Sequence, residues 1–113
     1  MTTTEITRWA DGGVHVVRVT GEFDLGACPA FRAESAEPAR ELLVVDLRQT
    51  TFLDSHALGA LIELNNRAQS AGFRLAIMRP DGHANRIFSV TGTDGSLPLY
   101  DPRVPVLAQM NYG

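Results

Sequence analysis

This 113-residue sequence contains no lysine, since all ten of its basic residues are arginine. The absence excludes several enzyme classes that depend on a lysine amine. A P-loop needs a lysine on its phosphates, Schiff-base chemistry needs a lysine nucleophile, and protein kinases need a catalytic lysine. We therefore expect no enzyme of these classes, and no bound cofactor that such a lysine would hold.

Cysteine, basic clusters and long apolar runs are also scarce. A single cysteine, Cys28, cannot form an internal disulfide, which is consistent with a reducing compartment. No apolar run approaches the ~20 residues that span a bilayer, and the first five residues lack the features of a signal peptide. We therefore expect a cytoplasmic protein without membrane contact.

The net charge is −3, and no basic cluster offers a surface for DNA or RNA, so we expect no direct nucleic-acid partner. Three dispersed histidines and one cysteine do not form a zinc motif. We expect no metal site.

Runs rich in β-branched and apolar residues predict strands. Residues 42–47 are apolar on both faces, which is typical of a central strand covered on both sides. The other predicted strands are 5–9 and 14–19, joined by a turn at residues 11–13, then 73–78, and a weaker edge strand at 97–100.

The clearest helix is predicted over residues 55–71, where small and apolar residues recur every three or four positions. Asp54 or Ser55 supplies its N-cap and Gly72 its stop, and Glu63 can pair with Arg67 one turn away. Further helices are expected near 27–36 and 83–91, with a short one near the C-terminus. The pattern predicts a single α/β domain with a mixed four- to five-stranded sheet and about four helices.

The most informative segment is residues 51–59. Phe52 and Leu53 are apolar and should anchor the loop before the helix, so that Asp54 and Ser55 lie at the helix N-terminus. The unpaired N–H groups and positive partial charge there favour an anion, including a phosphate on a serine. Serine and aspartate are also common helix caps, so capping alone is an alternative interpretation. Gly59 costs about 1 kcal/mol relative to alanine within a helix, which a close approach by another backbone or a partner would explain.

Several segments together resemble the STAS domains of bacterial anti-sigma-factor antagonists. The core motif is carried by residues 43–47 (Leu-Val-Val-Asp-Leu), 51–55 (Thr-Phe-Leu-Asp-Ser) and 58–59 (Leu-Gly). Residues 20–24 (Thr-Gly-Glu-Phe-Asp) resemble the segment after the family's second strand. Residues 73–75 and 86–92 resemble its next strand and its third helix. The resemblance covers about residues 14–100 and implies one STAS domain over residues 1–113.

The resemblance implies regulation of transcription by partner switching. In that family, an anti-sigma factor that is also a serine kinase phosphorylates the serine after the aspartate, and a serine phosphatase reverses this. Only the unphosphorylated protein binds the anti-sigma factor and so releases the sigma factor. By position, Ser55 would be the phosphoacceptor. The expected partner-binding residues are Glu22, Asp24, Asp54, His56, Leu58 and Gly59.

The sequence departs from the family pattern at two positions, because His56 and Ala57 stand where the family has serine or threonine followed by glycine. A STAS domain that binds its partner constitutively, without regulated phosphorylation, is therefore an alternative.

Two enzymatic alternatives fit the sequence less well. A serine hydrolase elbow needs glycine where Leu53 stands, and none of the three histidines is well placed as a base for Ser55. A receiver phosphorylated on Asp46, Asp54 or Asp24 needs a lysine that the chain lacks. We interpret Asp46 as a solvated strand end.

Overall fold

A computed structural model describes residues 4–36 and 42–101 of the chain. Its helices and strands are interspersed along the sequence. In order they are β1 (Glu5–Asp11), β2 (Val14–Phe23), η1 (Leu25–Ala27), α1 (Cys28–Glu34), β3 (Leu42–Asp46), β4 (Thr50–Leu53), α2 (Ser55–Ala71), β5 (Arg74–Met78), η2 (Gly82–Asn85), α3 (Arg86–Val90), η3 (Thr93–Gly95) and β6 (Leu99–Tyr100), where η marks a 3₁₀ turn.

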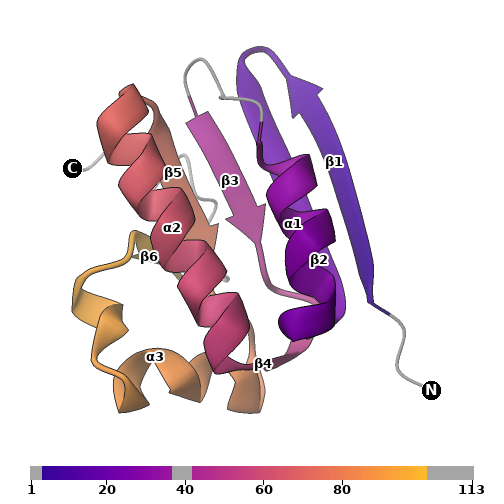
Figure 1. The fold of residues 1–113 in the computed structure, drawn as a ribbon, viewed down its shortest axis with the longest axis vertical. Coiled ribbons are helices and arrows are strands. Elements are labelled where there is room, and N and C mark those ends of the chain that lie inside the picture. Colours follow the sequence, from indigo (N-terminus) through magenta and orange to yellow (C-terminus); the bar gives the residue numbers. More distant parts are fainter. Residues whose placement is uncertain (1–3, 37–41, 102–113) are drawn as a thin grey trace.

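The strands form one mixed sheet in the order β1-β2-β3-β5-β6, with β4 paired to the end of β2 (Figure 1). Strand β1 is antiparallel to β2, and the remaining pairs are parallel. Gly12 and Gly13 have positive φ angles of 55° and 85°, which a tight turn between β1 and β2 requires. The predicted α/β fold with a mixed sheet is confirmed.

Helices α1 and α2 lie side by side on one face of the sheet (Figure 1). They cover the main core, whose largest fully buried side chains include Phe23, Phe31, Phe88, Leu43, Leu61 and Ile77. Helix α2 begins at Ser55 and ends at Ala71, as predicted, and Gly72 closes it in the left-handed conformation at φ 81°. A second, smaller apolar cluster lies on the other face, made of Leu42, Val44, Ala76 and Met78.

The sheet has six strands in the described residues, one more than the upper limit of the prediction. The additional strand is β4, which the sequence suggested was a loop. Strand β2 continues past Gly21, where the register shifts, and so reaches β4. Leu53 is buried in the core but Phe52 is exposed, so only one of the two apolar residues anchors this segment. The burial pattern of β4 does not alternate, since its two middle residues are both exposed, so period-two reasoning does not identify this strand.

The predicted helices at 27–36 and 83–91 are present but shorter. The first corresponds to α1, and the second corresponds to the turn η2 followed by α3. The short helix expected near the C-terminus lies outside the described residues. No helix in the described part of the chain is long and apolar enough to cross a membrane.

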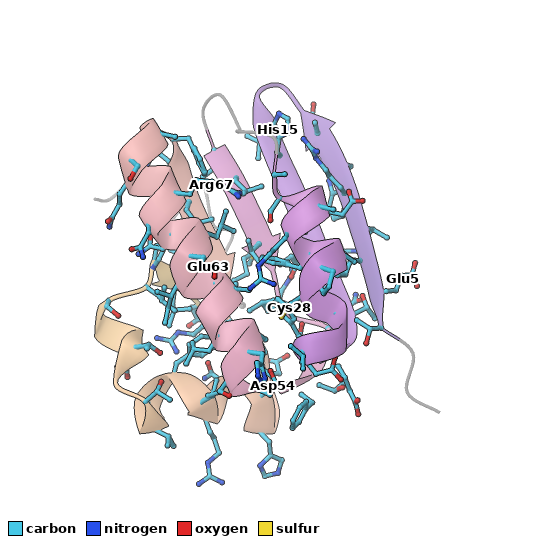
Figure 2. The ribbon with its side chains drawn as sticks, viewed as in Figure 1. Glu5, His15, Cys28, Asp54, Glu63 and Arg67 are labelled. Atoms are coloured by element: carbon cyan, nitrogen blue, oxygen red, sulfur yellow. The ribbon has the colours of Figure 1, made fainter. Side chains whose placement is uncertain are left out.

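The predicted pair between Glu63 and Arg67 is wrong. Glu63 instead accepts a hydrogen bond from Arg32 Nε at 3.1 Å, which joins α2 to α1, and Arg67 donates to the carbonyl oxygen of Ser35. Both residues lie on the side of α2 that faces α1 (Figure 2). Packing of the two helices brings partners closer than the next turn of the same helix offers.

Asp46 is not a solvated strand end, because its side chain is only 2% exposed. Arg18 Nε donates to it at 3.0 Å, and Arg48 donates to both its oxygens from the side chain, at 3.0 and 2.9 Å, and from the backbone. Burial alone raises the pKa of Asp46, but these hydrogen bonds outweigh burial and hold the pKa below its ordinary value. Asp46 is therefore a buried, fully paired carboxylate.

Candidate functional site

The start of helix α2 is organised by Asp54, which is the N-cap. Its Oδ1 accepts a hydrogen bond from the backbone N–H of Ala57 at 2.9 Å, and its Oδ2 accepts one from the N–H of Leu25 at 3.2 Å. The first bond satisfies a free donor of the helix, and the second fixes the η1 turn beside it. One carboxylate thus connects two segments that are 29 residues apart in sequence.

The Asp54 carboxylate is held in its charged form. Burial raises its pKa, but the backbone hydrogen bonds from Ala57 and Leu25, and the nearby His56 ring, together bring the pKa below its ordinary value. Asp54 therefore contributes a fixed negative charge next to Ser55 at neutral pH.

Ser55 is the first residue of α2 and is exposed to solvent. Its hydroxyl makes no hydrogen bond among the described residues, since Asp54 caps the helix in its place. Of the two predicted N-cap residues, Asp54 is therefore the one that caps the helix, and Ser55 is not. A free hydroxyl remains at the positive end of a 17-residue helix.

His56 and Ala57 occupy the positions that differ from the family pattern. The His56 side chain is 57% exposed, with Nδ1 at 3.6 Å from Asp54 Oδ2. Ala57 is fully buried in the core. The substitution at position 57 is thus absorbed by packing, whereas the imidazole at position 56 adds a polar ring to the surface around Ser55.

Leu58 and Gly59 were both expected on the binding face. Leu58 is only 6% exposed and packs in the main core, so the structure does not bring it to the surface with Ser55. A Cβ added at Gly59 would meet nothing within 4 Å. No backbone of the described chain approaches Gly59, so packing within the described residues does not account for this glycine.

Glu22 and Asp24 lie on the segment that leads from β2 to the Leu25–Asp54 contact, next to the start of α2. Glu22 is the ladder neighbour of Phe52 in the β2–β4 pair, and Asp24 caps η1 by accepting from the N–H of Ala27 at 3.2 Å. Asp24 directly precedes Leu25, the residue that donates to Asp54. The structure therefore brings these acidic residues and the helix start to one end of the molecule.

Two exposed apolar side chains beside this site were missed by sequence reasoning. Leu25 is 59% exposed and Phe52 is 48% exposed, and they lie on the segments that flank Asp54. Both side chains leave apolar area at the surface, on the two segments that meet at Asp54. No signal in the sequence separates Phe52 from Leu53, because both are apolar and the burial pattern of β4 does not alternate.

The geometry does not support the enzymatic alternatives. No hydrogen bond joins Ser55 to a histidine in the described residues, and His15 instead contacts Arg8 at 3.1 Å. The buried pairing of Asp46 leaves it no access to a phosphate donor. Within residues 4–36 and 42–101, no group of three or more potential ligands could hold a metal ion.

Known proteins are similar to this chain in sequence and in fold. A family model described as "Mlab, STAS domain" matches residues 6–101. A STAS-domain-containing protein of Pseudomonas aeruginosa is 32% identical over 84 residues, which are 73% of this chain and 83% of that protein. An anti-sigma F factor antagonist of Paenibacillus polymyxa is 26% identical over 102 residues, which are 87% of each chain.

Two solved structures extend the likeness. An anti-sigma factor antagonist from Mycobacterium paratuberculosis has a TM-score of 0.72 and 31% identity, covering 87% of this chain and 86% of its own. The phosphorylated form of a Bacillus cell fate determinant has a TM-score of 0.68, covering 97% of this chain and 98% of its own. Its identity is 16%, so this second likeness shows the fold alone.

Proposed function

The chain belongs to the STAS domain family, and from that premise we propose that it is an anti-sigma-factor antagonist controlled by phosphorylation of Ser55. In this proposal, the unphosphorylated chain binds an anti-sigma factor that is also a serine kinase, and the sigma factor is released. Phosphorylation ends the binding, and a serine phosphatase restores it. The exchange takes place in the cytoplasm, and contact with DNA belongs to the sigma factor.

The observation that carries the proposal is the division of roles between Asp54 and Ser55. Asp54 caps the helix, so the hydroxyl of Ser55 is exposed and has no partner among the described residues. A kinase needs an accessible hydroxyl that can be aligned with the γ-phosphate of ATP. A serine engaged as the cap would have to break that hydrogen bond first.

The surroundings of Ser55 explain why a phosphate would end binding. The exposed Leu25 and Phe52 offer apolar area to a partner, and Asp54 already carries a negative charge there. A phosphoserine adds about −1.5 to −2 charges at neutral pH. Covering that dianion with an apolar partner surface, without pairing it, costs several kcal/mol.

The partner's own nucleotide adds to the repulsion. A kinase that transfers phosphate to Ser55 holds ATP in line with the serine oxygen, so the phosphates of ADP face the product after transfer. A shift from mostly bound to mostly free needs about 5.5 kcal/mol. Like charges at the centre of an interface supply a large part of this without any change of fold.

The test is intact-mass analysis of the chain after incubation with ATP and the candidate anti-sigma kinases of its host. We expect one added phosphate on the wild type and none on the Ser55→Ala variant. A phosphate that persists in the variant would show that the site is wrong. Stable kinase binding without any phosphate would favour the alternative function, in which this STAS domain binds its partner constitutively. The departures from the family pattern at His56 and Ala57 are compatible with that alternative.

A further inference from the structure

Strand β1 is an open edge of the sheet in the described part of the chain. It has seven residues and pairs with β2 in one unbroken register. Natural proteins protect such edges with proline, lysine, bulges or very short strands, because the unpaired N–H and C=O groups of an edge can bind another strand. The opposite edge of the described sheet is protected in this way, since β6 has two residues and directly follows Pro98. Strand β1 contains no proline, lysine or bulge.

The free backbone groups of β1 belong to every second residue. Residues 12–13 form a two-residue turn, so the closing pair of Asp11 and Val14 is hydrogen-bonded within the hairpin. Hydrogen-bonded pairs alternate with other pairs along an antiparallel ladder, so the backbone groups of the intervening residues point away from β2. These outward-facing residues are Ile6, Arg8 and Ala10.

The sheet face opposite α1 and α2 carries an uncovered aromatic ring beside this edge. Trp9 is 41% exposed, and the guanidinium carbon of Arg18 lies 4.8 Å from the centre of its ring. Arg18 also donates to Asp46 through Nε, yet its side chain remains 30% exposed. Glu5 lies at the outer border of the sheet and points away from it (Figure 2), and it makes no ion pair among the described residues. An exposed ring, a partly exposed guanidinium and an unpaired carboxylate therefore accompany the open edge.

A second copy of the chain offers the same edge, and the charges of β1 select the register of an antiparallel pair. With the twofold axis at Arg8, this residue faces itself and Glu5 faces Asp11, and like charges directly opposite each other destabilise a sheet. With the axis at Trp9, the ladder is shorter and leaves Glu5 out. With the axis at Thr7, the threonine faces itself and Glu5 faces Trp9 of the second copy. The last register is therefore the favoured one.

This register also provides a partner for the unpaired carboxylate. The aliphatic stem of Glu5 covers the exposed ring of Trp9 in the second copy, and its carboxylate reaches the Arg18 that stacks on that ring. The guanidinium groups of Arg18 that do not bind Asp46 are available for this charge-assisted hydrogen bond. Twofold symmetry repeats the contact, so each dimer contains it twice.

We propose that the chain forms a symmetric dimer in which two β1 strands pair antiparallel about Thr7 and join the two sheets into one. A single pair of strands buries little area, so the association is weak, with a dissociation constant of about 100 µM. Helix α1 lies between β1 and α2 in Figure 1, so this dimer leaves the start of α2 uncovered. The inference therefore does not depend on the function proposed for Ser55.

The test is sedimentation velocity of the full chain over a concentration series, with two variants of opposite charge at Thr7. The side chain of Thr7 is exposed, so Thr7→Glu and Thr7→Lys should both fold. Each variant places like charges on the twofold axis and should weaken self-association at least about tenfold. An equal mixture of the two variants pairs a carboxylate with an amine on the axis and should dimerise at least as tightly as the wild type. A wild type that stays monomeric, or a mixture that dimerises no better than either variant alone, would overturn the proposal.

A matched control and a spectroscopic signal locate the contact. Thr51→Glu makes the same substitution at an exposed threonine of β4, and its self-association should stay within about twofold of the wild type. Trp9 is the only tryptophan of the chain, so quenching of its fluorescence by acrylamide reports on the edge alone. Its accessibility to acrylamide should fall as the wild type is concentrated and should stay constant in Thr7→Glu. Dimerisation of the wild type without this protection of Trp9, or equal losses in Thr7→Glu and Thr51→Glu, would refute pairing through β1.

Discussion

Asp46 ends strand β3 and Asp54 directly follows β4, the next strand in the sequence, yet the two aspartates have opposite surroundings. Asp46 is buried, and two arginine side chains and a backbone N–H occupy both its oxygens. Asp54 is bound by backbone amides and is partly exposed, and the next residue, Ser55, is left free at the surface. The first arrangement fixes the sheet internally, whereas the second arranges a surface for another molecule.

This difference shows how two aspartates that look alike in sequence take different roles. Asp46 accepts several charge-assisted hydrogen bonds in a buried position, so it should matter most for stability. A surface residue that is not engaged in packing can be modified at little cost to the fold. The variants below separate these two roles, beginning with the largest expected effect.

Replacing Asp46 with alanine should lower the free energy of unfolding by about 2–3 kcal/mol, because the charge-assisted hydrogen bonds from Arg18 and Arg48 to a buried carboxylate are lost. Urea unfolding of wild type and variant measures this loss. The matched control is Glu63→Ala, which removes an exposed ion pair and should cost at most about 1 kcal/mol. Equal losses in the two variants would show that burial of Asp46 has no special role.

Acidification should also lower the free energy of unfolding of the wild type, by part of the amount lost in Asp46→Ala. The pKa values of Asp46 and Asp54 lie below their ordinary values in the folded chain, so the folded state binds fewer protons than the unfolded state. The stability they provide is complete above the ordinary aspartate pKa of about 4 and is lost as the pH falls through the folded values. Urea midpoints between pH 6 and pH 2 should fall with pH, and less steeply in Asp46→Ala. A constant midpoint in the wild type would contradict both shifts.

Removing the helix cap should have the next largest effect. Asp54→Ala deletes the hydrogen bonds to Ala57 and Leu25 and should cost about 1–2 kcal/mol in thermal or urea unfolding. Asp81→Ala is the control, because Asp81 stands at the N-cap of η2 without a side-chain capping bond and should cost less than about 0.5 kcal/mol. Asp54→Ala should also weaken kinase binding, since Leu25 is no longer fixed beside Ser55. A loss no greater than that of Asp81→Ala would refute the capping role.

Gly59→Ala should change stability and binding in opposite directions. Nothing fills the space a methyl group would occupy, so the variant should be more stable by up to about 1 kcal/mol. Its affinity for the kinase should fall if a partner approaches Gly59. Gly72→Ala is the contrasting control, because its φ of 81° makes alanine destabilising there. Unchanged binding by Gly59→Ala would remove this residue from the proposed surface.

Sequence reasoning predicted the long-range framework of the fold because the apolar patterns of β3 and α2 are long and regular. Helix α2 was predicted with its observed ends since its stripe, cap and terminal glycine all agree. The short strand β4 and the Arg32–Glu63 pair were missed, because both depend on contacts between segments distant in sequence.

The candidate site could be predicted only in part for the same reason. The position of Ser55 at a helix start follows from local pattern, but the hydrogen bond that joins Asp54 to Leu25, 29 residues away, does not. Leu58 was misplaced because a motif does not show which side of a helix faces the core. Exposure of Leu25 and Phe52 required the folded chain.

The central claim is that added charge at Ser55 ends partner binding without disturbing the fold. The direct measurement is the affinity of the anti-sigma kinase for wild type, Ser55→Asp and Ser70→Asp, since the last adds the same charge at the opposite end of α2. We predict that Ser55→Asp binds at least tenfold more weakly, about 1.4 kcal/mol, with stability within about 0.5 kcal/mol of wild type. Ser70→Asp should bind like the wild type, and equal affinity of all three proteins would contradict the account.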